Sequence, residues 1–301
     1  MSMSPRQPLD ASQLAAVARL FSSGVLQEVA RRGKSPLFSR LARESGLAGA
    51  IPLAEPVRNL FDLAFSVLKR KCYRHEYVYK AAITHKILLG AHSLQTAAML
   101  TEFRVGKCKA DIAILNGTST VYEIKSERDK LDRLNTQVHA YRQAFAKVNV
   151  ITGENHLKSV LANVPSDVGV LLLTNRYQIS TVREAVDAPE RIIPGVIFDS
   201  LQMHEAKKIL VSLGFVVPKV PNTQIYQSLR EQFVKLAPYE AHAGMVKVLK
   251  DTRSLKPLAD LVDALPESLR AAAFSTPLRQ QNYARLASAM DVPLREALNW
   301  A

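Results

Sequence analysis

The sequence lacks long apolar runs, is poor in cysteine and shows no export signal. Its most apolar run, Val168 to Leu173, has the length of a buried strand and falls far short of the roughly 20 residues of a membrane helix. Cys72 and Cys108 form no CxxC motif and have no histidine at metal-ligand spacing, so we expect reduced thiols. The first ten residues are polar and lead into an amphipathic segment. These absences predict a cytoplasmic protein that does not enter a membrane.

Acidic residues are scarce relative to basic ones. The 301 residues include 40 Lys+Arg and 27 Asp+Glu, a formal charge of +13, and 48% are hydrophobic. The hydrophobic content excludes a wholly disordered chain, and the charge indicates a phosphate-rich partner or an anionic membrane surface. More than half of the excess lies in residues 1–75, which hold 12 basic and 5 acidic residues. Two clusters there, RRGK at 31–34 and Lys69-Arg70-Lys71, are predicted to contact phosphate groups. The alternative is a solvated helix face.

Apolar residues at helical spacing dominate both ends of the chain. Asp10 can cap a helix that Gly24 ends. The segment at 41–47 resembles the start of a helix-turn-helix, but Pro52 and Pro56 prevent a recognition helix from following, so we interpret it as a helical packing unit. Further helices are predicted at residues 25–32, 57–80, 83–100, 200–212, 223–236 and 239–251.

In the middle of the chain the pattern becomes that of strands. Strands are predicted at residues 102–105, 109–115, 119–125, 148–152, 168–174 and 196–198. Asn116-Gly117 marks a hairpin, and helices are predicted from Asp129 and up to about Asn163. Three strands followed by alternating helix and strand predict an α/β fold with a mixed sheet, antiparallel at the start and parallel where a helical crossover intervenes.

Three charged residues stand within these strands. Asp111 lies in the second strand, and Glu123 and Lys125 share one face of the third because side chains alternate. Glu123 and Lys125 fit an exposed ion pair worth under about 1 kcal/mol. Together with Asp111, they also fit a metal site. In a metal site, Asp111, Glu123 and the backbone carbonyl of Ile124 offer hard oxygen ligands for Mg²⁺, and Lys125 orients or helps deprotonate the attacking water. The second interpretation predicts hydrolysis of phosphodiester bonds.

The metal site requires a particular register in the hairpin. A regular two-residue turn at Asn116-Gly117 would pair Asp111 with Tyr122 and turn Asp111 away from the face of Glu123. An odd loop, with Gly117 in a left-handed conformation, or a bulge restores the required register. We therefore predict such an irregularity.

Asp111, followed twelve residues later by Glu-x-Lys within helix-strand-strand-strand-helix-strand order, resembles the PD-(D/E)XK nuclease superfamily, with Ala110 in place of the proline. In the next helix, Gln137 and Tyr141 repeat the Gln-x-x-x-Tyr element of nucleases from bacterial recombination helicase complexes. The run EFRVGKCKADIAILNGTSTVYEIKSERDKLDRLNTQVHAYRQAF, with YRHEYVYK upstream and IYQSLREQF downstream, is similar to a bacterial family placed in this superfamily by sequence. The similarity covers roughly residues 65 to 253.

This resemblance implies a restriction-endonuclease-like αβββαβ core and further site residues. Gln137, Tyr141 and Arg133 are expected to contact the nucleic-acid backbone. The superfamily also carries an acid on the helix before the first strand, and Glu76 fits this position better than the second candidate, Glu102.

The sequence thus predicts three regions: a basic helical region at 1–60, the nuclease-like core at 61–200 and a helical region at 201–301. The predicted function is a nuclease that uses Mg²⁺, or Mn²⁺ as a substitute, and acts on DNA rather than RNA. A nuclease that cuts both strands often dimerises, so a homodimer is one expected assembly. The alternatives are a catalytically silent nucleic-acid-binding or interaction protein on the same fold, and an enzyme of a mobile-element or phage-defence system that acts on structured RNA.

Overall fold

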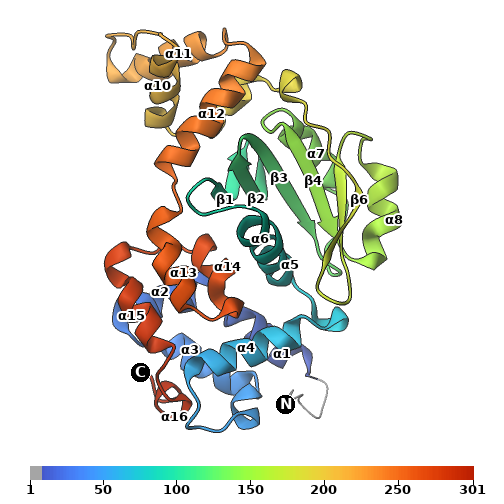
Figure 1. Cartoon of the computed structure of the whole chain (residues 1–301), viewed down its shortest axis with the longest axis vertical. Helices are drawn as coiled ribbons and strands as arrows, with labels where there is room; N and C mark the ends of the chain where they lie inside the picture. Colours follow the sequence, from blue (N-terminus) through green and yellow to red (C-terminus); the bar gives the residue numbers. More distant parts are fainter. Residues whose placement is uncertain (1–8) are drawn as a thin grey trace. The chain divides into compact units, whose positions relative to one another are not determined.

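A six-stranded mixed sheet organises the middle of the chain in the computed structural model, which describes residues 9–301. The chain folds into two units (Figure 1). The sheet unit comprises residues 86–174 and 178–255, and the terminal unit comprises the residues up to His85 together with 175–177 and 256–301. The boundaries predicted from the sequence, at residues 60 and 200, differ from the boundaries of these two units. The division into three regions therefore stays a prediction.

The strands follow one another across the sheet in the order β1-β2-β3-β4-β5-β6. They are β1 (Ala98–Val105), β2 (Cys108–Asn116), β3 (Thr118–Lys125), β4 (Lys147–Thr152), β5 (Gly169–Leu173) and β6 (Ile179–Arg183). The first three are antiparallel, β3, β4 and β5 are parallel, and β6 is antiparallel to β5. The parallel pairs are those joined by the helices α7 (Leu134–Arg142) and α8 (Glu154–Asn163), because only a crossover can return the chain to the same edge.

Two helices cover the face of β3 that carries its odd-numbered residues. Tyr141 of α7 contacts Glu123, and His242 of α12 (Pro238–Thr252) contacts Ser119. The buried core of the sheet unit lies here and extends to the helices α9 (Pro194–Ser200), α10 (Met203–Ser212) and α11 (Asn222–Phe233). At the end of α12, Arg253 donates two hydrogen bonds of 2.8 Å to the buried carboxylate of Glu205.

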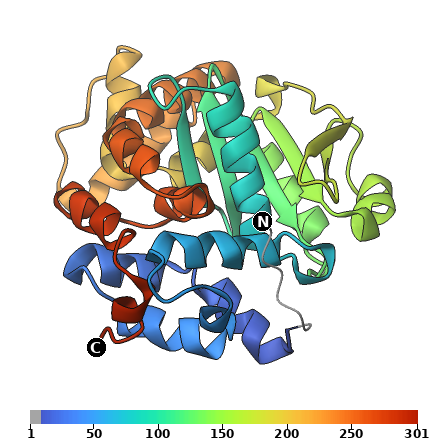
Figure 2. The same cartoon turned by 60° about the horizontal axis from the view of Figure 1, so that its bottom comes forward.

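The terminal unit is helical and combines both ends of the chain. Its helices are α1 (Ala11–Arg19), α2 (Ser23–Arg32), α3 (Pro36–Glu44), α4 (Val57–Leu68), α5 (Glu76–Ile83), α13 (Ala259–Ala264), α14 (Glu267–Ser275), α15 (Tyr283–Ala289) and α16 (Leu294–Ala297). Figure 2 shows the red C-terminal helices beside the blue N-terminal ones. Phe38 packs against both Phe61 and Trp300, so the last residues complete the N-terminal core.

Several elements differ from their predicted bounds. The segment 196–198 is not a strand: Pro194 starts α9, and three apolar residues cannot distinguish a strand from a helix. The helix predicted at 57–80 is two, α4 and α5, and the segment 83–100 contains a π-helical turn at Thr84–Leu88, the short α6 (Leu89–Ala91) and the start of β1. The strand β6 lies in a stretch predicted as loop.

The predicted N-cap of the first helix is confirmed, but Gly24 does not end that helix, because α1 ends at Arg19 and Gly24 lies within α2. Asp10 caps α1, with its carboxylate accepting a hydrogen bond from the backbone N–H of Gln13. Asp129 does not begin α7, since its carboxylate accepts two hydrogen bonds from Ser126 and closes a turn there. No helix in the part of the chain that the structure describes is long and apolar enough to cross a membrane. The prediction from the first ten residues falls largely on residues 1–8, outside the described ones.

The left-handed conformation of Gly117, at φ 75°, yields a stability prediction. A Cβ at Gly117 or at Gly49 would meet no atom within 4 Å, but only Gly117 has a positive φ. Gly117→Ala is therefore expected to lower the free energy of unfolding by about 1 kcal/mol through backbone strain alone. Gly49→Ala is the matched control and should leave it unchanged or raise it. Urea unfolding measures both, and an equal effect of the two substitutions would contradict this assignment.

Candidate metal and hydrolysis site

The centre of the candidate site is an ion pair on β3. Glu123 and Lys125 are 1% and 6% exposed, and the Lys125 ammonium donates a hydrogen bond of 2.7 Å to Glu123 Oε1. An exposed surface pair is therefore excluded. Because burial of an unpaired charge costs several kcal/mol, the two side chains are tolerated here only as a pair.

The hairpin register is the one that the metal site requires. Gly117 alone separates the paired residues Asn116 and Thr118, and Ile112 pairs with Tyr122. Asp111 is the next residue along β2 and therefore comes opposite Glu123. The predicted irregularity is confirmed, and its cause is the left-handed Gly117.

Asp111 ends the regular ladder between β2 and β3. Its carboxylate accepts a hydrogen bond of 2.7 Å from the backbone N–H of Ile124. A side chain has thus replaced a backbone acceptor, and this contact fixes the Asp111 carboxylate beside β3. The predicted role of the Ile124 carbonyl in metal binding stays a prediction.

Two residues of helix α7 form hydrogen bonds with the ion pair. Gln137 Oε1 accepts a second hydrogen bond from the Lys125 ammonium, at 2.9 Å. The buried hydroxyl of Tyr141 lies 2.9 Å from Glu123 Oε2 and 2.6 Å from the carbonyl oxygen of Lys109. Gln137 and Tyr141 therefore position Glu123 and Lys125, and their predicted contact with nucleic acid stays a prediction.

Burial sets the protonation of this network. It raises the pKa of Glu123, while the charge and hydrogen bond of Lys125 act against the rise. The pKa of Tyr141 is raised by burial, then by the negative charges of Glu123 and Asp111. The Tyr141 hydroxyl accordingly keeps its proton. The charge of the Asp111 carboxylate contributes to the raised pKa of Tyr141.

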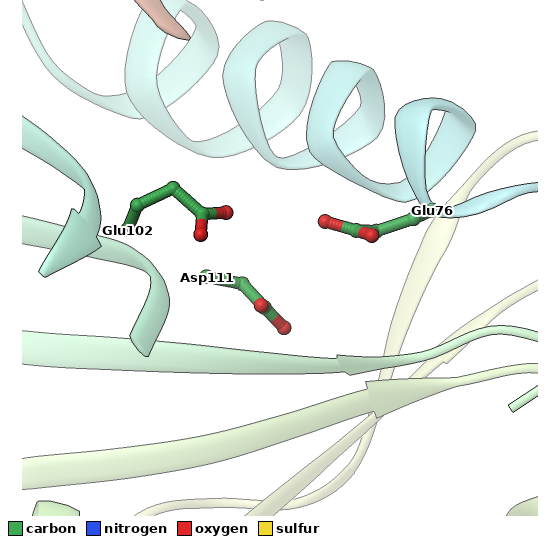
Figure 3. Close-up of side chains that lie close together, drawn as sticks. All are labelled: Glu76, Glu102 and Asp111. Carbon is green, nitrogen blue, oxygen red and sulfur yellow. The ribbon is translucent and has the colours of Figure 1, made fainter. Parts of the chain in front are cut away.

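Two further carboxylates lie close together where β1 pairs with β2. Oxygen atoms of Glu102 and Asp111 are within 4.8 Å of each other, and Figure 3 shows both side chains directed toward the same space. Glu102 has a φ of 54°, which is uncommon and unfavourable for a residue with a Cβ. Its exposed carboxylate forms an ion pair of 3.2 Å with Lys109.

The oxygen-rich donors of this pair suit a divalent cation. Mg²⁺ and Mn²⁺ prefer carboxylate and water ligands, and two carboxylates less than 5 Å apart can approach one ion. Asp111 is the predicted ligand that belongs to this pair, with Glu102 as its neighbour. Glu123 instead directs its carboxylate toward Lys125 and Tyr141.

The remaining predicted site residues belong to helices and to the segment that follows α4. Glu76 is in the first turn of α5 in the terminal unit, where it pairs with Lys80 at 2.6 Å, and its predicted role stays a prediction. Arg133 is exposed at the start of α7. In the basic cluster at 69–71, the Lys69 ammonium lies over the Phe65 ring at 5.2 Å, whereas Lys71 is exposed. Arg70 is half-buried between them.

The buried pair yields a pH prediction. Lys125→Met should lower the free energy of unfolding by about 3 kcal/mol at pH 8, because Glu123 loses its cation. The folded-state pKa of Glu123 is raised above the unfolded value of about 4.3, so its protonation favours the folded state. The loss is therefore smallest near pH 4 and grows as the pH rises through the folded pKa.

Unfolding in urea at pH 4 and pH 8 measures this difference. Glu123→Gln combined with Lys125→Met removes both charges and should recover much of the loss at pH 8. A loss that does not depend on pH, or a double variant no more stable than Lys125→Met, would refute the coupling.

Comparisons with known proteins identify the family. The family model described as "Bacteriophage P4 protein cII" matches residues 69–252, which include Asp111, Glu123 and Lys125. "Protein cII" of Enterobacteria phage P4 is 36% identical over 80 residues, which cover 26% of this chain and 30% of the phage protein. The match thus spans under a third of that relative's length. No solved structure matches the chain. Since the family model covers more than half of its residues, the chain belongs to the bacteriophage P4 protein cII family.

Proposed function

We propose that this protein is a metal-dependent nuclease with a core of the PD-(D/E)XK type. The observation that carries the proposal is the buried lysine on β3, which faces a carboxylate and lies one residue beyond the backbone group that binds Asp111. A buried ion pair is weak evidence for stability, since apolar residues often fill the same volume at no loss. A catalytic role explains why the sequence keeps it.

The order of elements also supports this proposal. The succession of three antiparallel strands, a crossover helix and a parallel strand is the order of the restriction-endonuclease-like core. The acid of β2 and the Glu-x-Lys of β3 lie at the end of the ladder far from the hairpin, and this proximity supports the proposal. The name of the phage relative, "Protein cII", states no activity, so it argues neither for nor against hydrolysis.

Each residue has a distinct role in the proposed reaction. Asp111, with Glu102 beside it, would hold the metal ion, which supplies Lewis-acid stabilisation of the phosphate and an activated water. Lys125 would orient that water and stabilise the negative charge that develops on the phosphate oxygens. Glu123 holds the Lys125 ammonium in place, and Gln137 and Tyr141 restrict both. Glu76 is the proposed further ligand.

The basic charge of the chain supports nucleic acid as the substrate. A net charge of +13 favours binding to a polyanion, and residues 69–71 and Arg133 are proposed phosphate contacts. DNA is the proposed substrate, with a silent binding protein on the same fold as the second candidate. The ion pair between Glu123 and Lys125 favours the enzyme, because a binder has no need to bury two charges.

The activity test uses plasmid and single-stranded DNA with Mg²⁺ or Mn²⁺. Lys125→Ala and Asp111→Asn are each expected to lower the cleavage rate by at least about a hundredfold, since each removes a group that stabilises the transition state. Lys219→Ala, at an exposed position outside the site, is the matched control and should keep the wild-type rate. Purified protein inert on DNA and RNA with either metal, yet still bound to nucleic acid, would favour the silent binder.

The strained backbone of Glu102 provides a second test. Glu102→Gly should raise the free energy of unfolding by about 1 kcal/mol, because glycine adopts a positive φ freely, and should weaken Mn²⁺ binding in calorimetry. Glu102→Gln should weaken Mn²⁺ binding without the gain in stability. Unchanged Mn²⁺ affinity in both variants would remove Glu102 from the site and leave the role of Asp111 intact.

A further inference from the structure

The opposite face of β3 carries a pocket that the proposed reaction does not use. Its volume is about 490 Å³, within the range of small-molecule sites, and all of its lining residues belong to the sheet unit. Thr120 and Tyr122 line it, and they alternate with Glu123 and Lys125, which face the other way. The pocket is thus separated from the Glu123–Lys125 pair by the sheet itself.

Two buried polar side chains in this pocket have no protein partner. Tyr122 and Asn149 are neighbours across β3 and β4, and each is only 7% exposed. Within residues 9–301, neither the Tyr122 hydroxyl nor the Asn149 amide makes a hydrogen bond to another residue. The hydroxyl and the amide therefore line the pocket with hydrogen-bonding capacity that no other described residue uses.

The backbone around Asn149 is shaped to accommodate its amide. Gly169 lies beside Asn149 across β4 and β5, and a Cβ on Gly169 would come within 2.0 Å of Asn149 Oδ1. Any other residue at position 169 would displace the amide. Burial raises the pKa of Tyr122 to about 12, so its hydroxyl stays protonated at neutral pH and can donate a hydrogen bond into the pocket.

The remaining walls combine charged and apolar side chains, and Lys147 also forms an ion pair of 3.8 Å with Asp187. Lys147 and Lys86 line the pocket, and Lys86 belongs to the π-helical turn, a distortion that often marks functional sites. Glu184 is the lining carboxylate. Ile114 and Leu171 supply apolar side chains on the same face.

We propose that this pocket binds an organic anion of mononucleotide size. Its ring would lie against Ile114 and Leu171, its anionic group beside Lys147 and Lys86, and its polar atoms within reach of Tyr122 and Asn149. This binding does not rest on the proposed nuclease activity, since none of the residues of the candidate hydrolysis site lines the pocket.

Calorimetric titration of the full chain with adenosine 5′-monophosphate tests the proposal, with adenosine and inorganic phosphate as the two partial probes. The nucleotide is expected to bind saturably and at least about tenfold more tightly than either partial probe. Tyr122→Phe removes one hydrogen bond to the ligand and should weaken binding about tenfold. Lys147→Met should weaken it several-fold, and because Lys147 is half-exposed, this variant keeps the test valid if Tyr122→Phe fails to fold.

Tyr239→Phe and Lys219→Met are the matched controls, since both residues are exposed and lie outside the pocket. They should bind the nucleotide as the wild type does. Three results would overturn the proposal: no saturable binding of the nucleotide, phosphate or adenosine alone binding as tightly, or Tyr122→Phe and Lys147→Met leaving the affinity unchanged.

Discussion

The buried ion pair between Glu123 and Lys125 constrains much of the sheet unit. Two charges at 1% and 6% exposure are tolerable only if each is held by the other and by further hydrogen bonds. Gln137 and Tyr141 supply those bonds from α7, and this requirement fixes the position of the helix over β3. The Tyr141 hydroxyl also reaches the carbonyl of Lys109, so β2, β3 and α7 meet at one network.

The acids of the site fall into two groups with different surroundings. Glu123 is enclosed and bound to a lysine, whereas Asp111 and Glu102 are more open and have carboxylate oxygens within 4.8 Å of each other. The enclosed group is restrained, because both carboxylate oxygens of Glu123 and the Lys125 ammonium have hydrogen-bond partners. The open group includes a backbone strained at Glu102, and strain of this kind is often found at functional sites. This division agrees with the proposal that the open group binds the metal ion and the enclosed group positions the lysine.

Periodicity predicted much of this arrangement and failed where tertiary contacts decide. The alternation of β3 places Glu123 and Lys125 on one face, and the parity of the hairpin required the irregular turn at Gly117. The burial of Lys125 could not be predicted, because it depends on α7 packing over the strand. The segment 196–198 was misassigned because its three apolar residues suit either element, and the strained φ of Glu102 has no signature in the sequence. The pocket at Tyr122 was likewise invisible, since it depends on Gly169 leaving room for Asn149.

The central claim is that the carboxylates beside the Glu123–Lys125 pair form a metal site. Anomalous diffraction from crystals soaked in Mn²⁺ tests it most directly. The account predicts a peak at roughly 2.0–2.2 Å from an Asp111 carboxylate oxygen, lost in crystals of Asp111→Asn. Saturating Mn²⁺ with no peak at Asp111 in the wild-type protein would contradict it.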